Sequence, residues 1–239
     1  MNPQTPRERA REQTIADIVR LGREHLAAHG AAALSLRAVA RDLGVVSSAV
    51  YRYVANRDEL LTLLLIDAYN ELGNQVDAAV GALPEDDHTG RFAALGRAVR
   101  KWALLEPARY ALLFGSPVPG YRAPAERTTE PGTRVILALM AIFEAAYRAG
   151  VMTGGSGPGE ARTKPRISPA LAADLEAIRI GQGLTLPDGL LARGALVWTS
   201  LFGAVSFEVF GQYGEDTFQA ADELYEHHLQ ALQGVAGLA

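Results

Sequence analysis

The stretch that decides the fold runs from Leu34 to Leu60 and reads LSLRAVARDLGVVSSAVYRYVANRDEL. Its first part predicts a helix over 36–43, because apolar side chains recur there at three- and four-residue spacing: Leu36, Val39, Ala40 and Leu43. Gly44 follows, and glycine suits a tight turn that needs a positive backbone angle. A second short helix is predicted over 47–53. Two short amphipathic helices joined by a turn of about three residues are typical of a helix-turn-helix.

The second short helix begins with the small and polar side chains that entry into a DNA groove requires. Ser47 or Ser48 is expected to cap it, as Ser35 caps the helix before it, and Ala49 adds a methyl group. Side chains of this size let the backbone approach base edges in the major groove. Val50 and Tyr51 are expected to face inward. The segment that opens at Ser47 is therefore predicted to lie exposed on a braced scaffold.

Other side chains of this block are predicted to meet phosphates or base edges. Tyr51, Arg52 and Tyr53 offer phenol and guanidinium groups, with the Tyr51 ring partly in the core. Arg37 and Arg57 are expected to flank the groove and neutralise phosphates. Alternatives stay open at this point. Serine-capped pairs of short helices occur in proteins that never bind DNA, Tyr51 could be a core residue, and Arg52 could simply be solvated.

The charge of the chain is unevenly distributed. The net charge is −4, but residues 1–60 hold nine arginines against seven acidic residues, a positive surplus of two. Residues 61–239 hold fourteen basic and twenty acidic residues, a negative surplus of six. Such asymmetry indicates a nucleic-acid-binding end. A surplus of two is weak evidence alone, so the arrangement of the residues carries the argument.

The rest of the sequence predicts helices throughout, with proline and glycine marking the connections. The further expected helices cover 8–29, about 57–80, 91–105, a segment opening at Pro107, 132–149, 168–180, 187–210 and 217–235. Loops are expected over Gly81–Gly90, 115–131 and 153–166. We predict an all-α protein of about ten helices, with a DNA-binding domain over 1–60. The helix 57–80 links it to a ligand-sensing and dimerising domain over 61–239.

The helix-turn-helix block resembles the TetR family of bacterial transcriptional repressors over about residues 10–70. The resemblance is carried by Gly30, Leu34-Ser35, Arg37, Val39-Ala40, Leu43-Gly44-Val45, Ser47, Tyr51, Tyr53, Arg57 and Glu59-Leu60. It implies DNA contacts at Ser35, Arg37, Ser47, Ser48, Ala49, Tyr51, Tyr53 and Arg57. Val46 is apolar where many relatives carry a polar residue, which makes the operator sequence less predictable. The implied function is a ligand-responsive repressor on double-stranded DNA, with activation left open.

The C-terminal part resembles a group of that family whose second domain carries a Trp-x-x-x-His-Gly-like signature, the WHG-type group. Here the segment reads Trp198-Thr199-Ser200-Leu201-Phe202-Gly203, so phenylalanine stands where histidine is usual. The stretch Pro107–Pro124 is similar to the same group. The departure at Phe202 puts any polar role of that position in doubt.

The helix expected over 187–210 has no polar face, which predicts burial on more than one side. One side would serve the core of its own domain and the other would meet a second copy of the chain. The last helix is expected to complete that contact through Phe218, Ala221, Tyr225, Leu229 and Leu232. Two helices from each subunit would form a four-helix interface around a two-fold axis. A homodimer presents two recognition segments, as a pseudo-palindromic operator requires.

A pocket for a small-molecule effector is expected among helices 91–114, 131–150 and 168–210. Its candidate lining residues are Trp102, Leu105, Phe114, Tyr147, Trp198 and Phe202. An aromatic-rich, largely uncharged wall suits a hydrophobic or aromatic molecule. For each single residue, a place in the plain core is the competing interpretation.

Composition narrows the remaining classes. The chain has no cysteine, which excludes disulfides and thiolate metal sites and fits a reducing cytoplasm. No apolar run opens it, and the stretch Gly194–Phe207 is shorter than the ~20 residues that a membrane span needs. We therefore expect a bacterial cytoplasmic protein, associated with the nucleoid and not with a membrane.

An enzyme is the main alternative, and the sequence gives it little support. His25 and His29 share a helix face, but no further ligand follows at metalloprotease spacing. His227 and His228 are adjacent and point apart, and no strand precedes the glycine-rich segment 154–159. No catalytic residue, metal or cofactor is expected. A helical protein-interaction bundle is the second alternative, and it predicts no salt-sensitive DNA binding.

Overall fold

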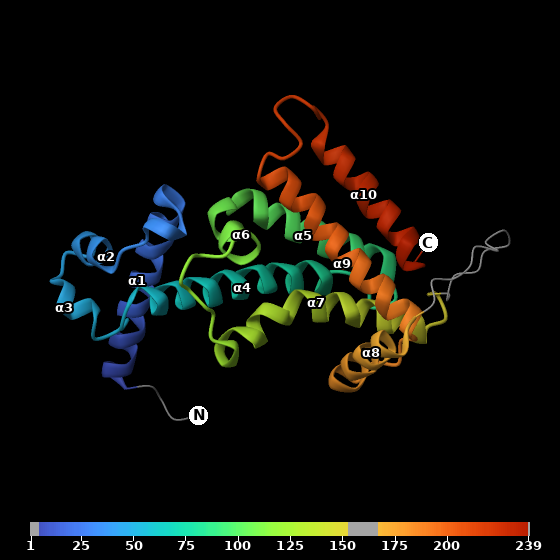
Figure 1. The fold of residues 1–239 in the computed structure, drawn as a ribbon, viewed down its shortest axis with the longest axis horizontal. Helices are drawn as coiled ribbons and strands as arrows, with labels where there is room; N and C mark the ends of the chain where they lie inside the picture. The colour runs from blue at the N-terminus through green and yellow to red at the C-terminus, as the bar shows by residue number, and fades with distance from the viewer. Residues whose placement is uncertain (1–4, 153–166, 239) are drawn as a thin grey trace. The chain divides into compact units, whose positions relative to one another are not determined.

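The computed structural model describes residues 5–152 and 167–238. Over these residues the regular structure is entirely helical, as predicted, with ten α-helices and one short 3-10 turn (Figure 1). Their bounds are α1 Pro6–His29, η1 Ala31–Ala33, α2 Leu36–Asp42, α3 Ser47–Val50, α4 Arg57–Gly81, α5 His88–Leu105, α6 Pro107–Phe114, α7 Ala125–Arg148, α8 Pro169–Gln182, α9 Asp188–Val209 and α10 Ala221–Ala236. The loop expected over 153–166 lies outside the described residues.

The chain forms two compact units. The first comprises the described part of Met1–Gly73 together with Ala103–Arg134, and the second comprises Asn74–Trp102 and the described part of Val135–Ala239. Helices α4, α5 and α7 contribute to both units. The division at residue 60 predicted above is a functional one and stays a prediction.

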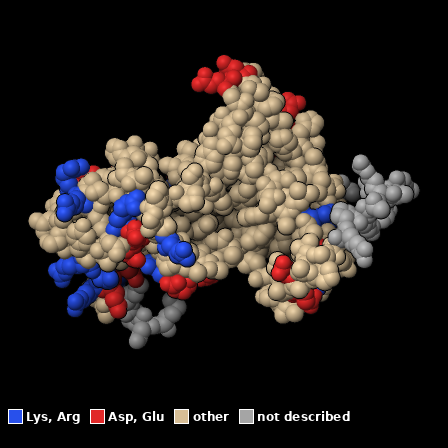
Figure 2. All heavy atoms as spheres, viewed as in Figure 1, with Lys and Arg blue, Asp and Glu red and all other residues tan. Residues whose placement is uncertain are grey.

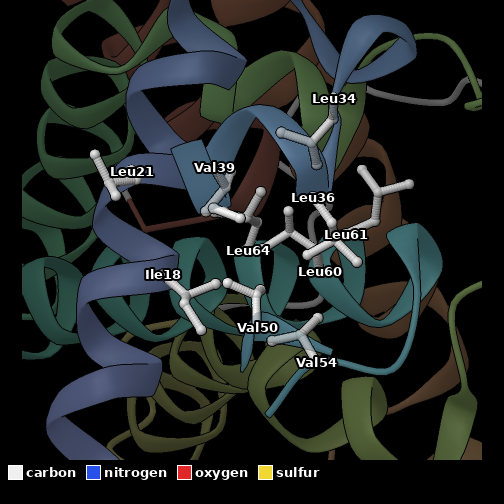
Figure 3. Packing of buried hydrophobic residues seen from close by; sticks show 11 residues of the cluster. Ile18, Leu21, Leu34, Leu36, Val39, Val50, Val54, Leu60, Leu61 and Leu64 are labelled. Carbon is white, nitrogen blue, oxygen red and sulfur yellow. The ribbon is translucent and has the colours of Figure 1, made fainter. Parts of the chain in front are cut away.

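The first unit is built around the core of the helix-turn-helix (Figure 3). Buried side chains from four helices and the segments beside them meet there: Ile18, Leu21, Leu34, Leu36, Val39, Ala40, Val50, Val54, Leu60, Leu61 and Leu64. Each large aliphatic side chain buried in this way contributes roughly 1.5–3 kcal/mol. A Cβ at Gly22 would lie 3.2 Å from Leu64 Cδ2, so the glycine lets α1 approach α4 closely. The apolar residues that recur at helical spacing thus form a common core, and this core holds the turn between α2 and α3.

Two expected loops are shorter in the structure, and the last helix begins at Ala221, later than the expected residue 217. The connection expected over 115–131 is shorter, because α7 begins at Ala125 and contains Pro131. The carbonyl of Pro124 accepts hydrogen bonds from the amides of Arg127 and Thr128, both at 3.1 Å, and starts the helix. A proline in the second turn removes one donor, and the helix continues past it. The loop expected over Gly81–Gly90 also shortens, because α4 includes Gly81 and α5 begins at His88.

In the second unit α9 packs along α10 and against α5 (Figure 1). Tyr225 Oη donates a hydrogen bond to the Gly96 carbonyl at 2.9 Å, and both Tyr225 and Leu229 are buried. The expectation that these two residues of α10 face a partner subunit is therefore wrong, because they complete the core of their own unit. Phe218 is 47% exposed, and Ala221 and Leu232 are half-buried.

Helix α9 has the length and composition of a membrane span when taken alone, with 22 residues and a mean hydropathy of 1.4 in a window of 18 residues. The whole helix is thus longer than the apolar stretch judged from sequence. Its buried side chains include Val197, Leu201 and Val205, and Glu208 near its end pairs with Arg100. Core helices of globular proteins have the same composition, so this feature is weak evidence for a membrane.

Candidate nucleic-acid interface

Residues 47–53 form the recognition segment, and the turn before it is held in place by α1 and α2. Helix α2 buries Leu36, Val39 and Ala40 against the core, and its end is tied to α1, where His25 Nε2 lies 2.5 Å from Asp42 Oδ2. This hydrogen bond lowers the pKa of the exposed Asp42 carboxyl. Gly44 then adopts φ 74°, a left-handed conformation that side-chain-bearing residues rarely accept. The turn is thus fixed by backbone conformation on one side and by buried apolar contacts on the other.

The α-helical part of the recognition segment is shorter than predicted. Helix α3 ends at Val50, and residues 51–53 continue as tight turns in place of the expected helix to residue 53. The amides of Arg52 and Tyr53 donate to the carbonyls three residues earlier, at 3.3 and 2.9 Å. Hydrogen bonds of this spacing tighten a helix end. The predicted order of residues along the segment is kept, but its last turn is narrower.

The expected capping serines are placed differently. Ser35 occupies the N-cap position of α2, and Val46, not Ser47 or Ser48, occupies that of α3. Neither cap makes a side-chain hydrogen bond to its helix among the described residues. The prediction that Ser47 or Ser48 caps α3 is therefore wrong. The serine hydroxyls of this region are consequently not used to close the helices that carry them.

The recognition segment is exposed, as a groove-binding segment must be. Arg37, Ser48, Tyr51 and Arg52 are exposed, and Ser35, Ser47, Ala49, Tyr53 and Arg57 are half-buried. Val50 faces inward at 1% exposed, as expected, whereas Tyr51 is 45% exposed and is therefore not buried as Val50 is. A Tyr51 ring that lies partly in the core is compatible with this exposure. Val46, at 71% exposed, stands at the same surface. DNA contact by the predicted set stays a prediction.

Two members of the predicted DNA-contacting set already have protein partners. The Arg57 guanidinium donates to the carbonyls of Ala31 and Ala32 at 2.8 and 3.1 Å, so it ties α4 to η1. The guanidinium of Arg11 lies 5.5 Å from the ring centroid of Tyr53, which links α1 to the end of the recognition segment. Sequence spacing did not indicate either contact, because the partners are distant along the chain.

The arginines of α1, α2 and the recognition segment differ in whether they form ion pairs. Arg20, Arg23 and Arg41 pair with acidic side chains. For Arg37 and Arg52, no ion pair occurs within the ranges that the structure describes. On the face drawn in Figure 2, basic side chains gather over α1–α3, with acidic side chains among them. The accessible positive charge therefore lies beside the exposed recognition segment, where phosphates would be met.

The six residues predicted to line an effector pocket are placed unequally. Trp102 and Phe202 are buried, Phe114, Tyr147 and Trp198 are half-buried, and Leu105 is 66% exposed. The rings of Trp198 and Phe202 lie 4.2 Å apart. A hollow of about 530 Å³ in the second unit lies between α7 and the end of α8, and none of the six lines it. Glu144 is among its lining residues; burial raises the pKa of Glu144, but hydrogen bonds from Thr185 and Arg148 outweigh this effect and lower it.

This arrangement of a braced first helix, a glycine turn and an exposed second helix defines a helix-turn-helix DNA-binding protein. Residues 18–64 match the family described as bacterial regulatory proteins, tetR family, and residues 92–232 match the tetracyclin repressor-like C-terminal domain. The chain belongs to the TetR family of transcriptional regulators, as its sequence indicated. It is therefore grouped with DNA-binding regulators of transcription and not with enzymes.

Similar proteins cover nearly the whole chain. The HTH-type transcriptional regulators Rv1816 of Mycobacterium tuberculosis and Mb1846 of Mycobacterium bovis are each 47% identical over 230 residues, which span 96% of this chain and 94% of theirs. The crystal structure assigned as regulatory protein SCO4313 is 36% identical, covers 96% of this chain and all of its own, and has a TM-score of 0.76. The TetR-family regulator PfmR of Thermus thermophilus, at 14% identity over 90% of this chain and 96% of its own, shares the fold with a TM-score of 0.54.

Proposed function

We propose that this chain represses transcription as a homodimer that binds a pseudo-palindromic operator and releases it when a small hydrophobic or aromatic effector binds. The observation that carries the proposal is the largely exposed segment 47–53 on a braced scaffold, where Arg52 within the segment and Arg37 on α2 make no ion pair with any described residue. The serine hydroxyls, the Ala49 methyl and the Tyr51 phenol supply groups that can read base edges or contact phosphates. The protein would act in the bacterial cytoplasm, at the nucleoid.

The second unit supports a two-fold dimer through the outer faces of α9 and α10. Helix α9 leaves Leu196 and Phe207 about half exposed, at 53% and 48%. A shallow hollow of about 410 Å³ lies beside Phe207, lined by residues of α9 and α10 and by Tyr213. An exposed apolar surface of this kind marks a protein–protein contact. Pairing of α9 and α10 with the same helices of a second copy would cover it in a four-helix arrangement.

The effector response would be a shift between two populations of the dimer. Clefts of about 300–1,000 Å³ lined mainly by apolar groups are typical of small-molecule sites, and the hollow beside Glu144 falls in that range. An effector that binds one conformation more tightly favours it, and a swing of α4 would then change the spacing of the two recognition segments. The six aromatic and aliphatic residues predicted from the sequence remain the alternative lining.

Gel-shift titration against the DNA upstream of its own gene tests the proposal. The parent protein is expected to bind this fragment with an affinity that falls steeply as salt increases, because phosphate contacts release counterions. An Arg37→Ala/Tyr51→Ala variant should lose most of this binding while its thermal unfolding temperature falls only slightly, since Arg37 is exposed and Tyr51 is 45% exposed. Equal binding by the variant, or no salt-sensitive binding by the parent, would exclude the proposed interface. Effector candidates are then judged by whether they weaken the parent's binding, and a promoter reporter separates repression from activation.

A further inference from the structure

Helix α1 extends beyond the core that its later turns complete. Its first buried side chain is Ile18, and residues 5–13 are all exposed. A helix rises about 1.5 Å per residue, so the turns from Pro6 to Gln13 span roughly 12 Å. The start of the helix is nevertheless fixed, because Thr5 and Glu8 form a reciprocal capping box. Glu8 Oε2 accepts from the Thr5 amide at 2.8 Å and from the Thr5 hydroxyl at 2.9 Å.

These exposed turns carry three arginines, Arg7, Arg9 and Arg11. Two acidic side chains, Glu8 and Glu12, lie among them, and Glu8 accepts hydrogen bonds from Thr5. Over residues 5–152 and 167–238, none of the three arginines makes an ion pair, whereas Arg20 and Arg23 further along α1 are both paired. Three arginines against two glutamates leave residues 5–13 with one net positive charge, and the three guanidinium groups are not held in ion pairs by the described residues.

Two of these arginines lie on the side of the recognition segment. Arg11 covers the Tyr53 ring at 5.5 Å, which places its face of α1 beside the end of that segment. Arg7 lies one turn earlier on the same face, because residues four apart on a helix are neighbours. Arg9, two residues from each, projects from the opposite face. Arg7 therefore lies on the same side of α1 as Arg11, the side that contacts Tyr53, whereas Arg9 lies on the other side.

We propose that Arg7, together with Arg11, contacts DNA phosphates beyond those that the recognition segment reaches, and so lengthens the footprint of each subunit. This inference rests on the proposed DNA-binding function. The ligand is the duplex backbone, since exposed guanidinium groups on a fixed helix match phosphate geometry without reading sequence. Arg7 is the better position for a substitution that tests this contact, because a change at Arg11 would also remove its packing on Tyr53.

The test compares Arg7→Gln with Arg9→Gln in the full-length protein, on a duplex of random sequence about 40 base pairs long, roughly four helical turns, and on the upstream fragment. Both variants lose one charge, and glutamine has nearly the helix propensity of arginine. One phosphate contact changes the slope of log affinity against log salt by about 0.9, which corresponds to roughly eightfold in affinity at about 0.1 M salt. Arg7→Gln should show these losses per subunit on both duplexes, whereas Arg9→Gln, which makes no phosphate contact, should change affinity less than about twofold. Circular dichroism should show equal helicity in all three proteins.

The outcomes separate this inference from the proposed function. Equal losses in the two variants, or no loss in either, overturn the Arg7 contact while DNA binding itself stands. A parent protein without salt-sensitive binding to either duplex overturns the proposed function and the Arg7 contact with it. A loss in Arg7→Gln that is confined to the upstream fragment contradicts a backbone contact, because a phosphate contact acts on any sequence.

Discussion

Replacement of Arg109 by methionine should destabilise the first unit more than any surface charge change. The Arg109 side chain on α6 is only 3% exposed, and its guanidinium donates to Glu71 at 2.8 Å and to Asp67 at 2.9 Å on α4. Arg23 on α1 also pairs with Asp67 and Glu71, so one arginine remains near both carboxylates.

The expected magnitude follows from what the substitution leaves behind. Removing one partner of a buried ion pair costs about 3–5 kcal/mol, because the other charge stays buried. Asp67 is 23% exposed and Glu71 is 32% exposed, so water and Arg23 compensate in part. We expect Arg109→Met to lower the free energy of unfolding by about 2–3 kcal/mol.

Urea denaturation measures this loss, and Arg97→Met provides the matched control. Arg97 on α5 makes a bidentate pair with Glu226 at 2.6 and 2.7 Å, but the two side chains are 57% and 41% exposed. Exposed pairs contribute less than about 1 kcal/mol. The reasoning fails if the two variants lose equal stability, or if Arg109→Met is as stable as the parent, because burial would then not decide the cost.

Further predictions concern the turn, the brace and the subunit contact. Gly44→Ala should lower stability by about 1–2 kcal/mol in thermal unfolding, because φ 74° is strained for alanine although nothing lies within 4 Å of the added Cβ; no loss would show that the turn relaxes freely. Asp42→Asn should destabilise the protein near neutral pH, and the difference from the parent should vanish as the pH falls through the folded-state pKa of Asp42. That pKa is lowered by His25, so the carboxylate's contribution is present above its unfolded-state pKa and lost below the folded one; a pH-independent difference in urea titrations would contradict this. Phe207→Glu should shift light-scattering mass from dimer toward monomer, whereas Ile180→Glu, on the exposed surface of α8, should not; a dimeric Phe207→Glu protein would place the subunit contact elsewhere.

Local pattern sufficed for the helix-turn-helix because each of its features depends on neighbouring residues. The spacing of Leu36, Val39 and Ala40 predicted which side of α2 is buried, and Gly44 predicted the turn with its positive φ. The direction of Tyr51 was predicted less well. Tyr51 keeps the helical backbone, with its amide donating to the Ser47 carbonyl at 3.2 Å, but neighbouring residues on a helix point about 100° apart, so the burial of Val50 does not extend to the whole Tyr51 side chain.

Contacts between segments that are distant along the chain could not be predicted from the sequence. Tyr225 and Leu229 belong to an amphipathic helix, and periodicity cannot say whether its apolar face meets its own unit or a partner. Arg57 has the position of a phosphate-contacting residue, yet its partners Ala31 and Ala32 lie 25 or more residues earlier. The proline-rich connection was misjudged for the opposite reason, since Pro131 has a strong local signal that the surrounding helix overrides.

The charge of the DNA-binding end shows why geometry, and not composition, supports the function. A surplus of two positive charges over residues 1–60 is too small to attract DNA by itself. In the folded chain, however, three acidic residues of this end are paired with arginines: Glu24 with Arg20, Asp42 with Arg41 and Glu59 with Arg127. Their negative charge is compensated locally, whereas Arg37 and Arg52 face solvent without an acidic partner in the described ranges. The field that a phosphate meets within a Debye length of about 10 Å is set by those nearby arginines, and the net charge of the whole chain is largely screened.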